Sequence, residues 1–136
     1  MKIDHVGIAV ENLKDTVPFY EKQLGLKKTA LETVKDQGVE IAFFKIGESK
    51  FELLEPLSEE SPIARHIKKR GEGIQHIALE VEDIEEKVAQ MKEEGVRFIG
   101  DKPSLGAEGM KVIFIHPKSS NGVLMELCEP LDKEDN

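Results

Sequence analysis

Two stretches, "HVGIAVENL" at residues 5–13 and "HIALEVEDI" at residues 76–84, decide the fold of this chain. Each begins with a histidine, continues with apolar residues, and ends with Glu, then Asn or Asp, then an apolar residue. A second pair, "ELLEP" at residues 52–56 and "ELCEP" at residues 126–130, follows in the same order. Two matches at offsets of 71 and 74 residues indicate that the chain is a tandem duplication.

The first half predicts a strand, a helix and three further strands. Residues 2–10 alternate and are rich in β-formers, which is typical of a strand. A helical face follows, with apolar residues spaced by 4, 3 and 4 positions, at Leu13, Val17, Tyr20 and Leu24. The next strands are expected at residues 26–34, 39–46 and 50–55.

Two residues set the expected ends of this first helix. Pro18 fits only the first turn of a helix, which predicts a late start near Asp15 or Thr16. Gly25 is expected to end the helix, as glycines commonly do at helix C-termini.

The second half repeats this order. Its helical face contains Ile84, Val88 and Met91, and Gly95 is expected to end the helix. Strands are expected at residues 96–99, 110–116 and 122–128. Between the halves, "SPIARHIKKRG" predicts a short helix with Ser61 as its cap and Pro62 in its first turn.

The fold class expected is therefore α+β, built from two tandem βαβββ modules. The chain is expected to form one domain, because each module is too small to cover its own sheet. Its expected parts are a first module at about residues 2–57, a linker helix at about 58–72, a second module at about 73–130 and a tail at 131–136.

Composition excludes some functions. Of the 136 residues, 19 are basic and 27 are acidic, and this net charge of −8 argues against nucleic acid as a partner. The single cysteine, Cys128, excludes an internal disulfide and fits a reducing compartment. No signal peptide is recognisable in "MKIDHVGIAV", and no apolar run is long enough to span a membrane, so a cytoplasmic protein without a membrane partner is expected.

Four residues of the repeat predict a metal site. His5 and His76 begin equivalent strands, and Glu52 and Glu126 lie in equivalent last strands. Two imidazoles and two carboxylates suit a divalent first-row metal ion. A lone histidine at the start of a strand is more often a partly buried structural residue. However, both glutamates lie between apolar residues, and an unpartnered buried carboxylate is costly, which favours the metal.

These motifs resemble those of the vicinal oxygen chelate superfamily, which includes glyoxalases, bleomycin-resistance proteins and extradiol dioxygenases. Within it the chain is most similar to the methylmalonyl-CoA epimerases, through "DHVGIAV", "KFELLEPL", "SPIARHIKKRGEGIQHIALEV" and "IFIHPKSSNGVLMELCEP". The resemblance covers about residues 2–130. It implies that the two modules form an open, cupped mixed sheet around a metal ion.

The resemblance also implies an activity, which is the interconversion of (2R)- and (2S)-methylmalonyl-CoA through removal and return of the C2 proton. Epimerisation needs a base on one face and an acid on the other. Glu126 is one candidate. Glu40, in "QGVEIAFF", is the other, because the resemblance places a second catalytic Glu in this context. At the Glu52 position some relatives carry Gln, which can also bind a metal.

The resemblance further implies cobalt(II) as the metal and a homodimer. The ligand types themselves also allow Mn, Fe, Ni or Zn. The basic run "HIKKR" and Lys118 are candidates for contact with the coenzyme A phosphates, although a solvated helix face explains the run equally well. Cys128 is expected to be a small buried hydrophobic residue, and His116 is expected to shape the turn before Pro117.

Two alternatives stay open within the same superfamily. One is isomerisation of the lactoylglutathione lyase type, which uses the same four ligands. The other is a small-molecule-binding module without catalysis, of the bleomycin-resistance type. Such a module gives no reason to keep both histidines and both glutamates.

Overall fold

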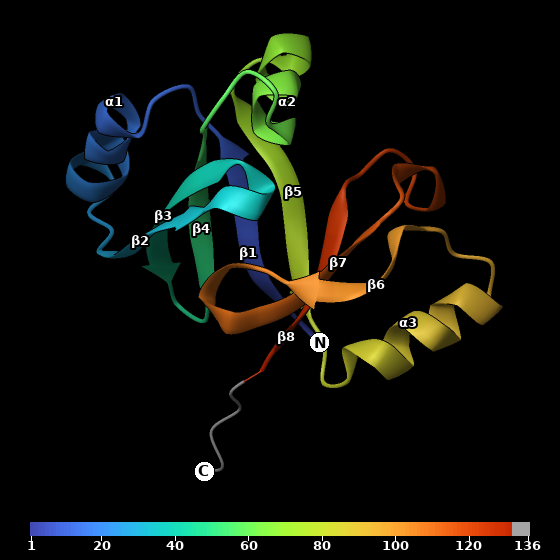
Figure 1. Ribbon diagram of the computed structural model, residues 1–136. Coiled ribbons are helices and arrows are strands. Elements are labelled where there is room, and N and C mark those ends of the chain that lie inside the picture. Colours follow the sequence, from blue (N-terminus) through green and yellow to red (C-terminus); the bar gives the residue numbers. More distant parts are fainter. Residues whose placement is uncertain (132–136) are drawn as a thin grey trace. The chain divides into compact units, whose positions relative to one another are not determined.

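The computed structural model describes residues 1–131, and the predicted tail lies outside these residues from position 132 onward. The chain divides into two compact units, residues 5–75 and residues 1–4 together with the chain from residue 76 on. The order of elements along the chain can be followed in Figure 1. Each unit is described separately.

The unit of residues 5–75 contains four strands, ordered β2-β3-β4-β1. Its elements are β1 (Lys2–Ala9, which begins in the other unit), α1 (Leu13–Pro18), a π-helical turn (Phe19–Gln23), β2 (Lys28–Val34), β3 (Val39–Ile46), β4 (Ser49–Pro56) and α2 (Pro62–Arg70). Strand β1 runs parallel to β4, and the other neighbours are antiparallel. This is the predicted βαβββ module followed by the linker helix.

The second unit repeats the arrangement with strand order β5-β8-β7-β6. Its elements are β5 (Gly73–Glu80, whose first residues belong to the other unit), α3 (Ile84–Glu93), β6 (Phe98–Leu105), β7 (Met110–Ile115) and β8 (Met125–Pro130). Strand β5 runs parallel to β8, and the other neighbours are antiparallel. In β1 Gly7 is the Cα partner of Glu52, and in β5 Ala78 is the partner of Glu126. Because Gly7 and Ala78 are equivalent in the repeat, the two modules share one register.

In each unit the helix covers one face of the sheet. Leu13, Ala42, Phe44 and Leu53 form the core beneath α1, and all four side chains are buried. The matching core beneath α3 contains Ile84, Val88, Ile113, Ile115 and Leu127. Successive side chains along a strand point to opposite faces of the sheet. The strand residues next to these core residues therefore point to the face that the helix does not cover.

The first helix begins earlier than the sequence predicted. Asn12, not a later residue, is the N-cap, and its Oδ1 accepts a hydrogen bond from the Asp15 backbone N–H at 3.1 Å. Pro18 is the last residue of α1, and a π-helical turn follows in which the Leu24 N–H donates to the Phe19 carbonyl at 2.9 Å. The sequence predicted Pro18 in the first turn, whereas Pro18 ends α1 and a different helix type follows it.

The ends of the other helices and strands lie closer to their predicted positions, except in two strands of the second module. Ser61 caps α2 by accepting from the Ala64 N–H at 3.1 Å, as predicted. Gly25 and Gly95 follow the helices with φ of 76° and 89°, which is the left-handed region that favours glycine. Strand β6 runs on to Leu105 past a register shift, and β8 begins only at Met125 because residues 117–123 form a turn closed by backbone hydrogen bonds.

The repeat also conserves the helix N-termini. Asp83, equivalent to Asn12, caps α3 by accepting from the Glu86 N–H at 3.1 Å. The last strands supply a second acceptor, because Glu55 accepts from the Leu13 N–H at 2.7 Å and Glu129 accepts from the Ile84 N–H at 2.9 Å. The second glutamate of "ELLEP" and "ELCEP" therefore binds the start of a helix.

Asp83→Ala is expected to lower the free energy of unfolding by about 1 kcal/mol, because α3 loses its capping hydrogen bond. Chemical denaturation of the purified variant measures this. Gln90→Ala, at an exposed position of the same helix, is the control and is expected to stay within about 0.5 kcal/mol of the unaltered protein. Equal stability of the two variants would contradict the cap.

No helix among residues 1–131 combines the length and the apolar composition needed to cross a membrane. The expectation that both modules form one domain stays a prediction.

Candidate metal centre

The first predicted ligand pair forms within the unit of residues 5–75. His5 Nδ1 lies 3.1 Å from Glu52 Oε2, and the two residues are 5% and 6% exposed. The parallel pairing of β1 with β4 brings them together. Phe51 and Leu53, on either side of Glu52, belong to the core beneath α1, so Glu52 lies on the opposite face of the sheet.

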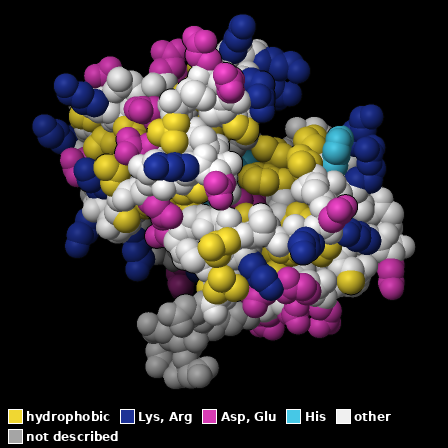
Figure 2. Space-filling model, in the orientation of Figure 1, with side chains coloured by type: hydrophobic (Ala, Val, Ile, Leu, Met, Phe, Trp, Pro, Cys, Tyr) yellow, Lys and Arg dark blue, Asp and Glu magenta, His cyan; other side chains and the backbone are white. Residues whose placement is uncertain are grey.

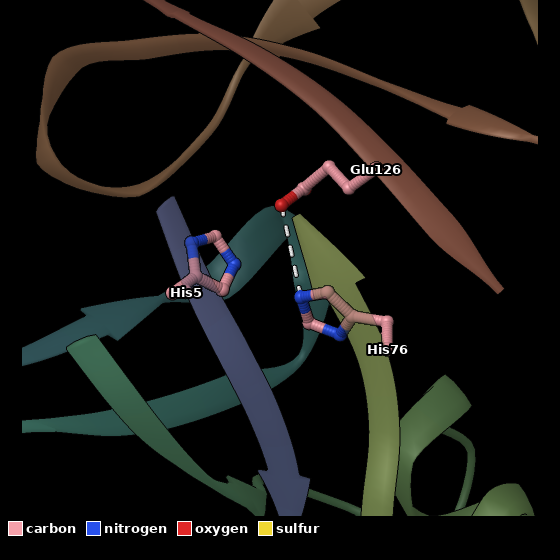
Figure 3. A group of neighbouring side chains, drawn as sticks. All are labelled: His5, His76 and Glu126. Atoms are coloured by element: carbon pink, nitrogen blue, oxygen red, sulfur yellow. Dashed lines mark ion pairs between the residues drawn. The ribbon is translucent and has the colours of Figure 1, made fainter. Parts of the chain in front are cut away.

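The second pair forms in the other unit. His76 Nε2 lies 3.6 Å from Glu126 Oε1, and these residues are 6% and 5% exposed. Figure 3 draws His76 on β5 and Glu126 on β8, and its dashed line marks this ion pair. The His76 ring also meets Phe114 edge to face, with ring centroids 5.4 Å apart. Phe114 is the cross-strand partner of Glu126, so the three side chains share one face.

The donor set fits a divalent metal ion. Each unit buries one imidazole and one carboxylate that already lie within reach of each other. Burying a carboxylate is costly unless a cation or hydrogen-bond donors compensate its charge. Imidazole nitrogen and carboxylate oxygen are ligands that first-row metals accept.

Sequence reasoning missed one buried acid near these residues. Asp4, immediately before His5, is 6% exposed. Its only signal was a carboxylate within the alternating strand predicted at residues 2–10. The repeat did not reveal it because the equivalent residue is Gln75.

Glu40, the second candidate for the acid–base role, lies on β3. Its cross-strand partner on β4 is Glu55, whose carboxylate binds the start of α1. Glu40 Oε2 accepts a hydrogen bond from Thr33 Oγ1 at 3.3 Å, on the same face. Two residues further on, Ala42 packs beneath α1. Glu40 therefore lies on the helix side of the sheet, and Glu52 lies on the other side.

Two smaller expectations are confirmed. Cys128 is fully buried beside Ala78 and Val112 and behaves as a small core residue. His116 shapes its turn, because its Nδ1 accepts a hydrogen bond from the Lys118 N–H at 3.1 Å.

Basic side chains gather over α2 in the space-filling view of Figure 2. They are Arg65, Lys68, Lys69 and Arg70, all exposed. His66, on the same helix, has a pKa below its ordinary value, because partial burial and the nearby Arg70 both disfavour its protonated form. The positive charge of α2 therefore comes from its lysines and arginines.

Comparison with known proteins identifies the family. Residues 4–114 match the sequence profile of the Glyoxalase/Bleomycin resistance protein/Dioxygenase superfamily. The chain belongs to this superfamily. The resemblance inferred from the repeat and its end motifs is therefore confirmed.

Three relatives of this superfamily member are informative. The ethylmalonyl-CoA/methylmalonyl-CoA epimerase of Cereibacter sphaeroides is 42% identical, over 93% of this chain and 96% of the relative. A crystal structure of a hypothetical protein from Bacillus halodurans is 56% identical, with a TM-score of 0.95 over 99% of this chain and 98% of that one. A methylmalonyl-CoA epimerase solved with methylmalonyl-CoA and NH4+ is 38% identical, with a TM-score of 0.94 over 99% of this chain and 98% of that one. The superfamily fold expected from the sequence is thereby confirmed.

Proposed function

We propose that this chain is a metal-dependent epimerase that interconverts (2R)- and (2S)-methylmalonyl-CoA. The observation that carries the proposal is the pair of buried His–Glu contacts, His5–Glu52 and His76–Glu126, one in each module. They occur in a chain that is 42% identical, over nearly its whole length, to an ethylmalonyl-CoA/methylmalonyl-CoA epimerase.

The four residues of these pairs are proposed to hold one divalent ion together. The equal register of the two modules supports this, because it puts each His–Glu pair at the equivalent place of its own sheet. The resemblance favours cobalt(II), and the ligand types also accept Mn, Fe, Ni or Zn. When bound, the ion would act as a Lewis acid toward the thioester and carboxylate oxygens of the substrate.

The chemistry at C2 requires a base at the metal site. The C2 proton is acidic because the carbon lies between a thioester and a carboxylate. Glu126 is proposed to take this proton, so that the C–H electron pair delocalises onto the thioester oxygen. Burial of Glu126 beside Phe114 keeps bulk water from competing for that proton.

The rest of the substrate needs a binding surface for its phosphates. The exposed cations of α2, which include Lys68 and Lys69, are proposed to attract the coenzyme A phosphates. A cytoplasmic location is proposed because the single cysteine of the sequence, Cys128, fits a reducing compartment. A homodimer is proposed on the family resemblance.

Deuterium exchange tests the function directly. Bound metal is removed from the protein with a chelator, and cobalt(II) is then added. The protein is incubated with one epimer of methylmalonyl-CoA in heavy water. The other epimer and C2 deuterium are expected to appear with the metal, and neither is expected without it. The measurements are elemental analysis, chiral assay of the product and mass spectrometry.

The same experiment separates the alternatives. Protein that binds no divalent ion, even when one is supplied, would favour the non-catalytic binding module. Protein that binds the ion and isomerises the glutathione–methylglyoxal adduct, but not methylmalonyl-CoA, would favour the lyase.

A further inference from the structure

A row of apolar side chains leads away from Glu126 across the sheet of the second unit. Glu126 on β8 is the cross-strand partner of Phe114 on β7, and Phe114 is in turn the partner of Ile99 on the edge strand β6. Neighbouring strands lie about 4.8 Å apart. Phe114 is therefore one strand away from the proposed base, and Ile99 is two strands away.

Phe114 and Ile99 lie on the face of this sheet that α3 does not cover. Their neighbours along the strands, Ile113 and Phe98, pack in the core beneath α3. Successive side chains point to opposite faces, so Phe114 and Ile99 point away from the helix. The edge-to-face contact between the rings of Phe114 and His76, 5.4 Å apart, agrees with this placement.

Exposure to solvent rises along the row. Glu126 is 5% exposed, Phe114 is partly exposed, and Ile99 is 51% exposed. The row is therefore open toward the edge strand. It offers a ligand an apolar surface, made of one aromatic and one branched side chain, that begins directly beside the carboxylate.

The first module exposes no equivalent aromatic ring. Phe43 is the repeat equivalent of Phe114 and is the cross-strand partner of Glu52. However, Phe43 is 0% exposed, and Lys50 Nζ lies 5.9 Å from its ring centroid. Of the two equivalent aromatic residues, only Phe114 can contact a ligand.

We propose that Phe114 and Ile99 bind the alkyl substituent on C2 of the substrate and thereby decide which malonyl-CoA thioesters react. This inference rests on the proposed function. A base that takes the C2 proton must lie within hydrogen-bond reach of it, and the substituent is attached to the same carbon. The next side chain in the row, Phe114, is therefore the apolar group that a methyl substituent meets.

The open end of the row widens the expected class of substrates. A methyl group reaches Phe114 alone, whereas a longer unbranched substituent extends along the row toward Ile99. Each further methylene group that is buried against apolar side chains contributes about fourfold in binding. The expected substrates are therefore 2-alkylmalonyl-CoA thioesters with a short unbranched substituent, and ethylmalonyl-CoA is expected to react within about tenfold of methylmalonyl-CoA.

The test is Phe114→Ala, assayed with methyl-, ethyl- and propylmalonyl-CoA at saturating cobalt(II). Loss of the ring is expected to lower kcat/KM for methylmalonyl-CoA by at least about tenfold. The ratio of kcat/KM for ethylmalonyl-CoA to that for methylmalonyl-CoA is expected to rise by about fourfold, because the space left by the ring accepts the added methylene group.

Two further variants extend the test. Phe114→Leu keeps an apolar side chain, and its values are expected to lie between those of Phe114→Ala and the unaltered protein. Calorimetric titration with cobalt(II) shows whether either substitution also disturbs His76. Ile99→Ala is expected to lower the ratio of propylmalonyl-CoA to methylmalonyl-CoA turnover by about fourfold, because only the longer substituent reaches Ile99.

Leu105→Ala is the matched control. Leu105 is 66% exposed on the same edge strand as Ile99. It lies on the helix side of the sheet, because its cross-strand partner Lys111 contacts Glu85 of α3 at 2.6 Å. Leu105→Ala is expected to keep the substrate ratios of the unaltered protein.

Two results would overturn the proposal. Equal losses with all three substrates in Phe114→Ala would show that the ring only supports His76. An unaltered protein that epimerises methylmalonyl-CoA but not ethylmalonyl-CoA would show that the open end of the row admits no longer substituent. If the unaltered protein epimerises none of the three thioesters, the proposed function itself fails, which is a different result from unchanged ratios in the Phe114 variants.

Discussion

His76→Ala is expected to lose high-affinity binding of cobalt(II) and, with it, almost all epimerisation. The substitution removes one of the four proposed ligands and leaves Glu126 buried without its 3.6 Å imidazole partner. Loss of a group that merely supports a metal ligand typically costs 10–100-fold in affinity. Loss of the ligand itself is therefore expected to cost more than about 100-fold, measured by titration calorimetry.

Thermal unfolding provides an independent measure of the same variant. A ligand present at about 100 times its dissociation constant stabilises the folded protein by about 2.7 kcal/mol. The unaltered protein should show this stabilisation on addition of cobalt(II), and His76→Ala should not. His66→Ala, on the partly exposed helix α2, is the control and should keep it. Equal metal stabilisation of all three proteins would remove His76 from the site.

Glu126→Gln is expected to reduce epimerisation by at least about 10²–10⁴-fold. The change keeps the shape of the side chain and removes the proposed base. It also replaces a charged ligand with a neutral amide, so metal affinity should fall as well. Rate assays across a range of cobalt(II) concentrations separate the two effects, because the missing base cannot be restored by saturating the metal site.

The repeat supplies a matched control for this prediction. Glu52 occupies the equivalent position in the first module, in the same register, but is not a proposed base. Glu52→Gln is therefore expected to weaken metal binding and to regain most of its activity at high cobalt(II). If Glu126→Gln regains activity in the same way, Glu126 acts only as a ligand.

Much of the fold could be read from the sequence because it depends on local patterns. The alternation of a strand and the periodicity of a helix are visible over a few neighbouring residues. Because the chain is duplicated, each predicted strand or helix could be compared with its equivalent in the other module. The same holds for the two His–Glu pairs, since equivalent residues at equivalent strand positions acquire equivalent neighbours. The late start predicted for the first helix was wrong, because Asn12 caps the helix and α1 begins at Leu13. Pro18 ends α1, and a π-helical turn follows it.

The sequence by itself determined the two βαβββ modules, the Ser61 cap of the linker helix and the residues of the two His–Glu pairs. Only the tertiary structure decided which acids share a face with Glu52. Successive side chains point to opposite faces of a strand, and a shift of one residue in register reverses them all. Glu40 pairs with Glu55, whose carboxylate binds the start of α1, so Glu40 lies on the helix side of the sheet. Glu32 lies on the face of Glu52 because it pairs with Ile41 on the neighbouring strand. Such pairing between strands leaves no local pattern in the sequence.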